Sequence, residues 1–261
     1  MSDTQPPSLV SRLLAGWPGD VLAAGAFLTR LPLRAASGME ALAAASRAFP
    51  LIGLGLGAVA GGAMWLAAWA NLHPLACAFM GVIAMAWMTG ALHEDGLADF
   101  ADGMGGRDKQ RRLEIMRDSR IGSFGVLALI FAVGIKAAIL AGLQGPGIAW
   151  AAFAAAAAMS RAVMAPCMTL LRPARADGLG KSAGRPDALV SAQSLAIGAV
   201  AAGILLGWQL GLAALAAALA AFLAVGWLAR SRLGGYTGDV LGALQQVAEI
   251  FILLVVGAFL P

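Results

Sequence analysis

Residues 121–142 read IGSFGVLALIFAVGIKAAILAG, an apolar run in which Lys136 is the one charged side chain. About 20 consecutive apolar residues in a helix cross the ~30 Å hydrocarbon layer of a membrane. The chain of 261 residues is 60% hydrophobic and 12% charged, and soluble globular proteins carry about twice that share of charge. The run and the composition predict an all-α fold, a polytopic bundle of transmembrane helices.

Seven apolar runs are long enough to cross the membrane. A shorter apolar segment, Val21–Leu31, is closed by Arg30 and Pro32, and we expect it to form an interfacial or re-entrant helix. Residues 1–261 are expected to form one integral-membrane domain. The predicted spans are Phe49–Ala70, Leu75–Leu92, Ile121–Gly142, Ile148–Met168, Leu189–Leu206, Leu210–Ala229 and Val240–Leu260.

Charge is confined to one set of connections between these runs. Sixteen of the 18 Lys and Arg residues lie in the N-terminal segment and in loops at about residues 93–120, 169–188 and 230–239. Loops rich in Lys and Arg stay in the cytoplasm. The N-terminus and these loops are therefore predicted to be cytoplasmic and the C-terminus periplasmic, in a bacterial inner membrane. The same confinement argues against nucleic acid as a partner, despite the net charge of +4, and Met1–Asp20 lacks the pattern of a cleaved signal peptide.

The loop after the second run begins with HEDGLADFADG, residues 93–103. The spacing of Asp95, Asp99 and Asp102 places them on one face of a helix. Carboxylates stacked this way repel one another unless a cation joins them, and oxygen ligands favour Mg²⁺ or Mn²⁺ over zinc. The alternative is a solvated loop, against which the helical register and the glycines that follow it argue. His93 is either a further ligand or a hydrogen-bond partner.

Cationic residues follow the acidic segment and fill the second charged loop. Arginine can hold phosphate through two parallel hydrogen bonds, so carboxylates followed by arginines point to metal-assisted phosphoryl transfer. Surface ion pairs and the positive-inside bias account equally well for any single one of these cations. The candidates for substrate binding are Arg117, Arg120, Arg172, Arg175 and Lys181.

A third polar segment, GGYTGD at residues 234–239, leads into the last apolar run. Asp239 either caps that helix or supplies a further metal or substrate ligand, with Thr237 beside it. Arg161 lies inside a span, where an ionisable residue is functional by default, and it either pairs with Glu249 or faces the substrate. Lys136 either reaches toward the membrane surface or forms a similar pair.

These motifs resemble those of the cobalamin synthase family, the adenosylcobinamide-GDP ribazoletransferases. The resemblance is carried by TGALHEDGLADFADG at residues 89–103 and by RLEIMRDSRIGSFG at residues 112–125. The motifs occur in the same order as in the family along most of the chain. The uncharged spans resemble the family only in being apolar. Shorter matches are FLTRLP at 27–32, FPLIG at 49–53, Ser160-Arg161 with Pro166, and GGYTGD at 234–239.

The resemblance implies a transferase that joins adenosylcobinamide-GDP to α-ribazole, or to its 5′-phosphate, and releases GMP in the last steps of cobalamin biosynthesis. It also implies dependence on Mg²⁺. On this basis Asp95, Asp99 and Asp102 would hold the metal on the diphosphate, and Asp102 or Asp118 would accept the proton of the attacking hydroxyl. Arginines of the two large loops would hold the GDP moiety. The expected partners are these substrates and the lipid bilayer, and a homo-oligomer is compatible with the sequence.

Two other classes of membrane protein share parts of this pattern. CDP-alcohol phosphotransferases carry a D-G-x-x-A motif, but an arginine is expected directly after its alanine, where this chain has Asp99. A transporter would use Lys136, Arg161 and Glu249 along a pathway, but the charges of this chain gather in loops on one side. The sequence therefore favours the transferase.

Overall fold

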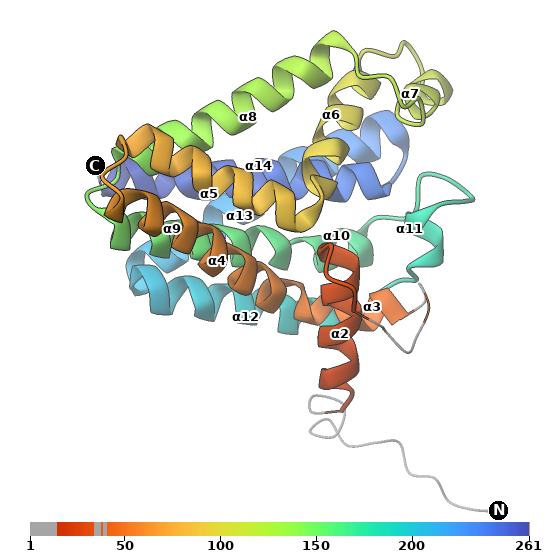
Figure 1. Ribbon diagram of the computed structural model, residues 1–261. Helices are drawn as coiled ribbons and strands as arrows, with labels where there is room; N and C mark the ends of the chain where they lie inside the picture. Colours follow the sequence, from red (N-terminus) through yellow and green to blue (C-terminus); the bar gives the residue numbers. More distant parts are fainter. Residues whose placement is uncertain (1–14, 34–37, 39–40, 261) are drawn as a thin grey trace, which may run out of the picture.

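The computed structural model describes residues 15–33, 38 and 41–260. The long helices among them lie roughly side by side (Figure 1). This arrangement confirms the predicted all-α bundle. The predicted cytoplasmic N-terminus falls on residues 1–14, which lie outside the described part of the chain.

Six helical segments of the described residues are long and apolar enough to cross a membrane, and they correspond to six of the seven predicted runs. One of the six consists of α9 and its continuation α10, and another of α4 with the short α3 and η2 before it. The bounds of these helices are α3 Leu42–Ala45, η2 Ser46–Ala48, α4 Phe49–Trp69, α8 Ser123–Gly142, α9 Pro146–Ala162, α10 Met164–Leu170, α12 Ala188–Leu206, α13 Trp208–Leu233 and α14 Gly238–Phe259.

The remaining predicted run, Leu75–Leu92, is broken before its end. Helix α5 (Pro74–Thr89) stops at Gly90, and α6 (Leu92–Met104) leaves at 90° to it. Gly90 (φ 66°) and Ala91 (φ 56°) both adopt the left-handed conformation, which is uncommon for a residue with a side chain. As a result α6, whose 13 residues are too few to cross the membrane alone, lies across one end of the bundle (Figure 1).

Large apolar side chains cover the outside of the long helices. Phe131 on α8 is 60% exposed and Ile204 on α12 is 78% exposed, and soluble proteins rarely leave such surface in contact with water. These side chains fit contact with lipid, so the chain is a multi-pass membrane protein. Helix α2 (Trp17–Leu28) has 12 residues, too few to cross; it confirms the predicted short N-terminal helix, whose place at the membrane surface stays a prediction.

The alanine-rich helix α9 occupies the centre of the bundle. Of an apolar stretch of 18 residues in the span that α9 forms with α10, 83% is buried, against 28% for α8. Glycines at every fourth position of α4, namely Gly53, Gly57 and Gly61, face it: a Cβ at Gly57 would lie 2.6 Å from the Cα of Ala154. Small residues let membrane helices approach this closely, which explains the alanine content.

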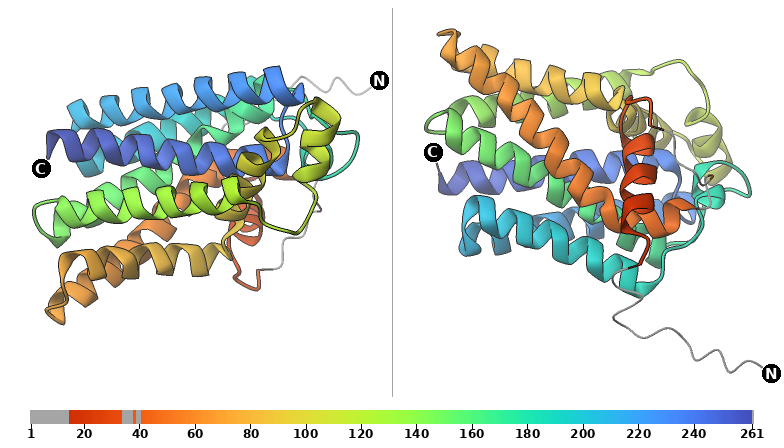
Figure 2. Two further views of the ribbon diagram at one scale, coloured as in Figure 1. Left: turned by 90° about the horizontal axis from the view of Figure 1, so that it is seen from above. Right: turned by 60° about the horizontal axis from the view of Figure 1, so that its bottom comes forward.

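The charged segments of the chain meet at one end of the bundle. Helix α7 (Lys109–Ile115), the short α11 (Leu179–Ser182) and the connection from α13 to α14 lie at this end, and the C-terminus lies at the other (Figure 1, Figure 2). The predicted clustering of charge on one side is therefore confirmed.

Candidate active site

A cavity of about 200 Å³ opens where α6, the start of α14 and the loop after α10 meet. Its polar lining comes from His93 and Asp95 on α6, Arg175 and Asp177 in the loop, and Thr237 and Asp239 at the start of α14. Three segments that lie far apart in the sequence thus contribute to one site. Of the predicted site residues, the cavity lining includes His93, Asp95, Arg175, Thr237 and Asp239.

A contact between two glycines brings the acidic residues of α6 to Asp239. A Cβ at Gly96 would lie 3.0 Å from the carbonyl oxygen of Asp239 and 3.2 Å from the Cα of Gly242. Because neither glycine has a side chain, the backbones of α6 and α14 touch at this crossing. Asp95 and Asp99, on either side of Gly96 along α6, are therefore held close to the first turn of α14.

The carboxylates around this crossing repel one another. Partial burial, followed by the negative charges of Asp95, Asp239 and Asp102, raises the pKa of Asp99 to about 7, and Arg175 opposes this rise. Asp99 therefore lies within electrostatic reach of three other acids. A cation bound among these side chains would relieve the repulsion.

Arg175 and Asp239 are placed by their surroundings. A single β-bridge joins Pro173 to Tyr236, and the Tyr236 hydroxyl donates to the carbonyl oxygen of Gly180 at 2.8 Å. The Thr237 hydroxyl caps α14 by accepting from the N–H of Val240 at 3.3 Å, and it also donates to the Asp239 carboxylate at 3.1 Å.

The guanidinium of Arg175 donates to the carbonyl oxygen of Leu113 at 3.0 Å and lies 3.9 Å from the Asp239 carboxylate. One cation is therefore fixed beside the acids.

Asp102, the third acid of the predicted row, has a different neighbourhood. Its carboxylate accepts from the N–H of Gly122 at 2.7 Å and from the N–H of Gly125 at 2.9 Å. These are free N–H groups at the start of α8, so Asp102 acts as a helix cap supplied by another helix. It lies on α6 as predicted, but it does not line the cavity. Its predicted roles as metal ligand and proton acceptor stay predictions.

Asp118, Arg120 and Arg117, three further predicted site residues, form ion pairs on the surface. The Arg120 guanidinium donates to the Asp118 carboxylate at 2.6 Å, and this hydrogen bond lowers the pKa of Asp118 to about 2. Arg117 donates to Asp177, a residue of the cavity lining, at 2.5 Å. Arg117 therefore lies at the rim of the cavity, whereas Asp118 and Arg120 are paired outside its lining.

The remaining predicted cations do not reach the cavity lining. Lys181 is exposed on α11. Arg172 lies in a separate groove, described below. Arg161 is buried in α9, where its guanidinium donates to the carbonyl oxygen of Ala157 at 3.0 Å and lies 3.7 Å from the sulfur of Met85.

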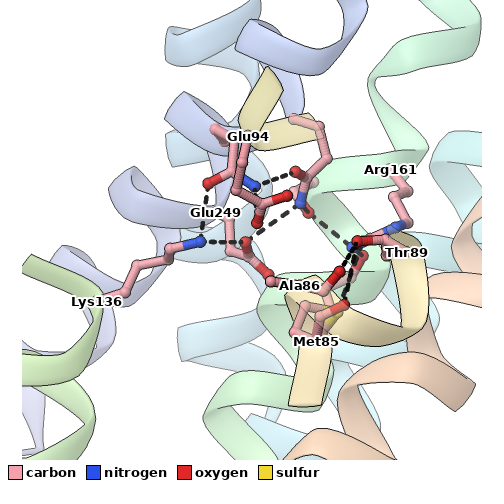
Figure 3. A network of polar contacts seen from close by, with 11 residues as sticks. Met85, Ala86, Thr89, Glu94, Lys136, Arg161 and Glu249 are labelled. Atoms are coloured by element: carbon pink, nitrogen blue, oxygen red, sulfur yellow. Dashed lines mark hydrogen bonds and ion pairs between the residues drawn. The ribbon is translucent and has the colours of Figure 1, made fainter. Parts of the chain in front are cut away.

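A buried polar network lies beneath the acidic helix (Figure 3). Lys136 on α8 donates to Gln246 at 2.8 Å and forms an ion pair with Glu249 at 3.3 Å, both on α14. Gln246 in turn donates to Glu94 at 3.0 Å. Of the two alternatives for Lys136, the structure therefore shows the ion pair. The network joins α6, α8 and α14 next to the cavity, because Glu94 precedes Asp95 along α6.

Gln246 and Glu94 were not among the predicted site residues. Two adjacent glutamines in the apolar run of α14 (Gln245 and Gln246) are a signal that a sequence alone offers, because amides buried in a membrane helix need partners. His93 is buried next to this network and lines the cavity, and its Nε2 has no partner among the described residues. Burial, aided by Arg161 and Lys136, lowers the pKa of His93 well below its usual value, so its imidazole is neutral and free to hydrogen-bond a ligand.

A metal site made by the protein alone is not complete. Within the described ranges no three His, Cys, Asp or Glu side chains lie close enough together to hold one ion. Magnesium, however, is often bound by one or two carboxylates together with substrate phosphates and water. The acids at the cavity fit such a shared site.

Comparisons with known proteins agree with the motifs. The profile of the family described as cobalamin-5-phosphate synthase matches residues 20–257. A protein of Bradyrhizobium diazoefficiens named adenosylcobinamide-GDP ribazoletransferase is 42% identical over 245 residues, which cover 92% of this chain and 94% of the relative. A protein of the same name from Azorhizobium caulinodans is 42% identical over 257 residues, covering 94% and 96%. No solved structure matches the fold significantly.

Proposed function

Because the chain belongs to the cobalamin-5-phosphate synthase family, we propose that the cavity between α6 and α14 binds the diphosphate of adenosylcobinamide-GDP and carries out phosphoryl transfer there. The enzyme is a transferase of the ribazoletransferase class. The observation that carries the proposal is the meeting of Asp95, Asp239 and Arg175 in one cavity, with Asp99 beside it. Acids and a fixed arginine together are what a bound metal diphosphate requires.

The reaction is written as a displacement at phosphorus. A hydroxyl of α-ribazole, or of its 5′-phosphate, attacks the phosphorus that carries cobinamide, and the bond from this phosphorus to the oxygen shared with GMP breaks. GMP leaves with the electron pair, and the proton of the hydroxyl passes to a base. The products are adenosylcobalamin, or its 5′-phosphate, and GMP.

Mg²⁺ fits the donor set of the cavity. Two of the three carboxylates of Asp95, Asp99 and Asp239 would hold it together with oxygens of the diphosphate, because these acids repel one another in its absence and are the hard oxygen ligands it prefers. When bound, the ion would neutralise the charge that develops on the diphosphate oxygens.

Cationic and neutral groups of the lining would position the substrate. Arg175, fixed by the Leu113 carbonyl, would bind phosphate oxygens through the free part of its guanidinium. Arg117 at the rim and neutral His93 at the base of the cavity would hold further polar groups. For Arg120, Arg161, Arg172 and Lys181 the cavity geometry offers no support, and substrate binding by them stays a prediction.

The proton acceptor belongs among the acids of the cavity. Asp118 is a weak base because its pKa is about 2, and both oxygens of Asp102 already accept backbone N–H groups. Asp177 of the lining is paired with Arg117, which leaves Asp95, Asp99 and Asp239 next to the bound substrate. One of them would accept the proton while the others keep the cation.

The test is the release of GMP by the purified full-length protein in detergent. With adenosylcobinamide-GDP, α-ribazole and Mg²⁺ supplied, Asp95→Asn and Asp239→Asn should each lower the rate by about 100-fold or more, the effect of losing one group that stabilises the transition state. Glu114→Gln is the matched control, since Glu114 pairs with Arg111 on the surface outside the cavity. Near-normal rates for both aspartate variants would refute this site, and Mg²⁺-independent turnover would refute the metal.

A further inference from the structure

A second polar site lies at the same end of the bundle. Arg172, Arg185 and Arg230 line a groove of about 460 Å³, together with Leu170, Leu171 and the backbone of Gly235. We call it the arginine groove. No acid lines it, in contrast to the cavity described above.

A wall of backbone separates the groove from the cavity. The N–H of Tyr236 donates to the carbonyl oxygen of Arg172 at 2.9 Å, and the N–H of Ala174 donates to the carbonyl oxygen of Tyr236 at 2.8 Å. Pro173 and Tyr236 line the cavity, whereas Arg172 and Gly235 line the groove. The two sites therefore bind separate groups.

Two arginines of the groove, Arg172 and Arg185, are held by backbone carbonyls without being neutralised. Nε of Arg172 donates to the carbonyl oxygen of Gly234 at 3.1 Å, and Nε of Arg185 donates to the carbonyl oxygen of Thr169 at 2.8 Å. Over the described residues no carboxylate forms an ion pair with Arg172, Arg185 or Arg230. The terminal N–H groups of Arg172 and Arg185 are thus oriented, and all three guanidinium groups are left for an anion.

The groove also has an apolar side, formed by Leu170 and Leu171. Leu170 is 65% exposed, and Leu171 closes the groove against α13 near Gly226. Trp227, three residues before Arg230 on α13, is 68% exposed. Tryptophan is enriched where the hydrocarbon layer meets the headgroups. An anion in this groove would therefore have exposed apolar side chains beside it.

We propose that the arginine groove binds the phosphate of an anionic phospholipid. The guanidinium groups of Arg185 and Arg230 hydrogen-bond the phosphate oxygens, and the first part of an acyl chain lies along Leu170. Juxtamembrane cations attract anionic lipids in this way. The site is independent of the transferase reaction, because the wall between residues 172–174 and 234–236 keeps the lipid out of the cavity.

The experiment measures lipid binding to the full-length protein in detergent by native mass spectrometry. Phosphatidylglycerol is titrated against phosphatidylcholine, its zwitterionic match. The wild-type protein should prefer phosphatidylglycerol, and Arg185→Gln with Arg230→Gln should weaken its binding by about 30-fold, as expected for about 1 kcal/mol from each cation. Arg232→Gln, in the same last turn of α13 but outside the groove, should leave it unchanged.

Three results would overturn the proposal. Equal binding of the two lipids by the wild-type protein would show that the groove does not select a negative headgroup. An equal loss in Arg232→Gln would show that net charge alone attracts the lipid. Binding of inorganic pyrophosphate or GDP that depends on Arg185 and Arg230, without phosphatidylglycerol binding, would assign the groove to a soluble phosphate compound. If the Gln pair fails to fold, Arg185→Lys with Arg230→Lys, which keeps both charges, should bind with intermediate affinity.

Discussion

Gly96 and Gly242 meet backbone to backbone at the crossing of α6 and α14, where a Cβ on Gly242 would lie 3.2 Å from the Cα of Gly96 and 3.1 Å from the carbonyl oxygen of His93. This contact sets the distance between the acids of α6 and Asp239. All the atoms that an added methyl group would meet belong to the backbone, so they cannot move aside without shifting a helix.

Gly242→Ala should therefore lower both stability and activity. Overpacking of this kind costs about 1–3 kcal/mol, and the separation of Asp95 from Asp239 should lower turnover further than the loss of folded protein explains. Thermal unfolding in detergent and GMP release from the folded fraction measure the two effects. Gly134→Ala on α8 is the control, because nothing lies within 4 Å of its added Cβ. Equal losses of stability and activity in this control would show that the contact between α6 and α14 does not cause the effect.

Asp99 and Asp102 should respond differently to substitution, although both belong to the same acidic row. Asp99→Asn is expected to abolish turnover while leaving expression and membrane insertion intact. Asp102→Ala removes the cap of α8 and should cost about 1–2 kcal/mol of stability. The Mg²⁺ concentration that gives half-maximal rate should stay unchanged in the Asp102 variant. A marked rise in this concentration would instead make Asp102 a metal ligand.

Binding of Mg²⁺ should depend on pH through Asp99. In the metal-free protein its pKa is about 7, so the carboxyl binds a proton below that pH and must release it to the ion. Affinity should fall by up to about tenfold for each pH unit below 7 and level off above it. Isothermal titration calorimetry of the detergent-purified protein measures the Mg²⁺ affinity. An affinity that does not change between about pH 5 and about pH 8 would contradict the prediction.

The raised pKa of Asp99 affects folding in the opposite direction: the stability of the metal-free protein falls as the pH rises, whereas its affinity for Mg²⁺ increases. Because the pKa of Asp99 in the folded protein lies above its ordinary value of 3.8, the metal-free folded state binds more protons than the unfolded state between those values. The contribution of Asp99 to stability is therefore present below pH 3.8 and is lost as the pH rises through about 7.

The ion pair of Lys136 and Glu249 should show its importance when one partner is removed. Both side chains are at most 1% exposed, so Lys136→Met leaves a buried charge without its partner, at a cost of about 3–5 kcal/mol. Adding Glu249→Gln removes that charge and should restore part of the loss. Unfolding midpoints of both single variants and the double variant measure the coupling; additive losses would mean that the two residues do not interact.

The orientation of the bundle can be measured with single cysteines. Cys77 and Cys167 are buried, so an introduced thiol reports on its own position. In intact cells a membrane-impermeant maleimide should label Gln144→Cys, in the uncharged connection between α8 and α9, and leave Lys181→Cys unlabelled. The positive-inside bias sets this expectation. The reverse pattern would place the candidate active site in the periplasm.

Apolar runs and helical spacing predict a large part of this fold. Six spans and a helix carrying Asp95, Asp99 and Asp102 follow from residue periodicity, since each depends on local sequence. The 90° turn after α5 does not, because Ala91 adopts a left-handed conformation that its sequence gives no reason to expect. The turn is where the predicted run Leu75–Leu92 departs from the structure.

The contents of the site depend on packing between distant segments. The row of three acids is divided because the start of α8 folds back onto Asp102, and no pattern along α6 could indicate this. Arg172 and Arg175 are three residues apart yet line different sites. Their separation results from the pairing of residues 172–174 with 234–236, which is a tertiary contact.

The glycine row of α4 has a further consequence for how the enzyme works. With Gly53, Gly57 and Gly61 pressed against α9, the two helices interlock too tightly to slide or rock past each other, as the halves of an alternating-access carrier must. Catalysis at the end of such a scaffold does not require α4 and α9 to move against each other. Bulky polar reactants then arrive and depart on one face of the bilayer, so turnover needs no passage through it.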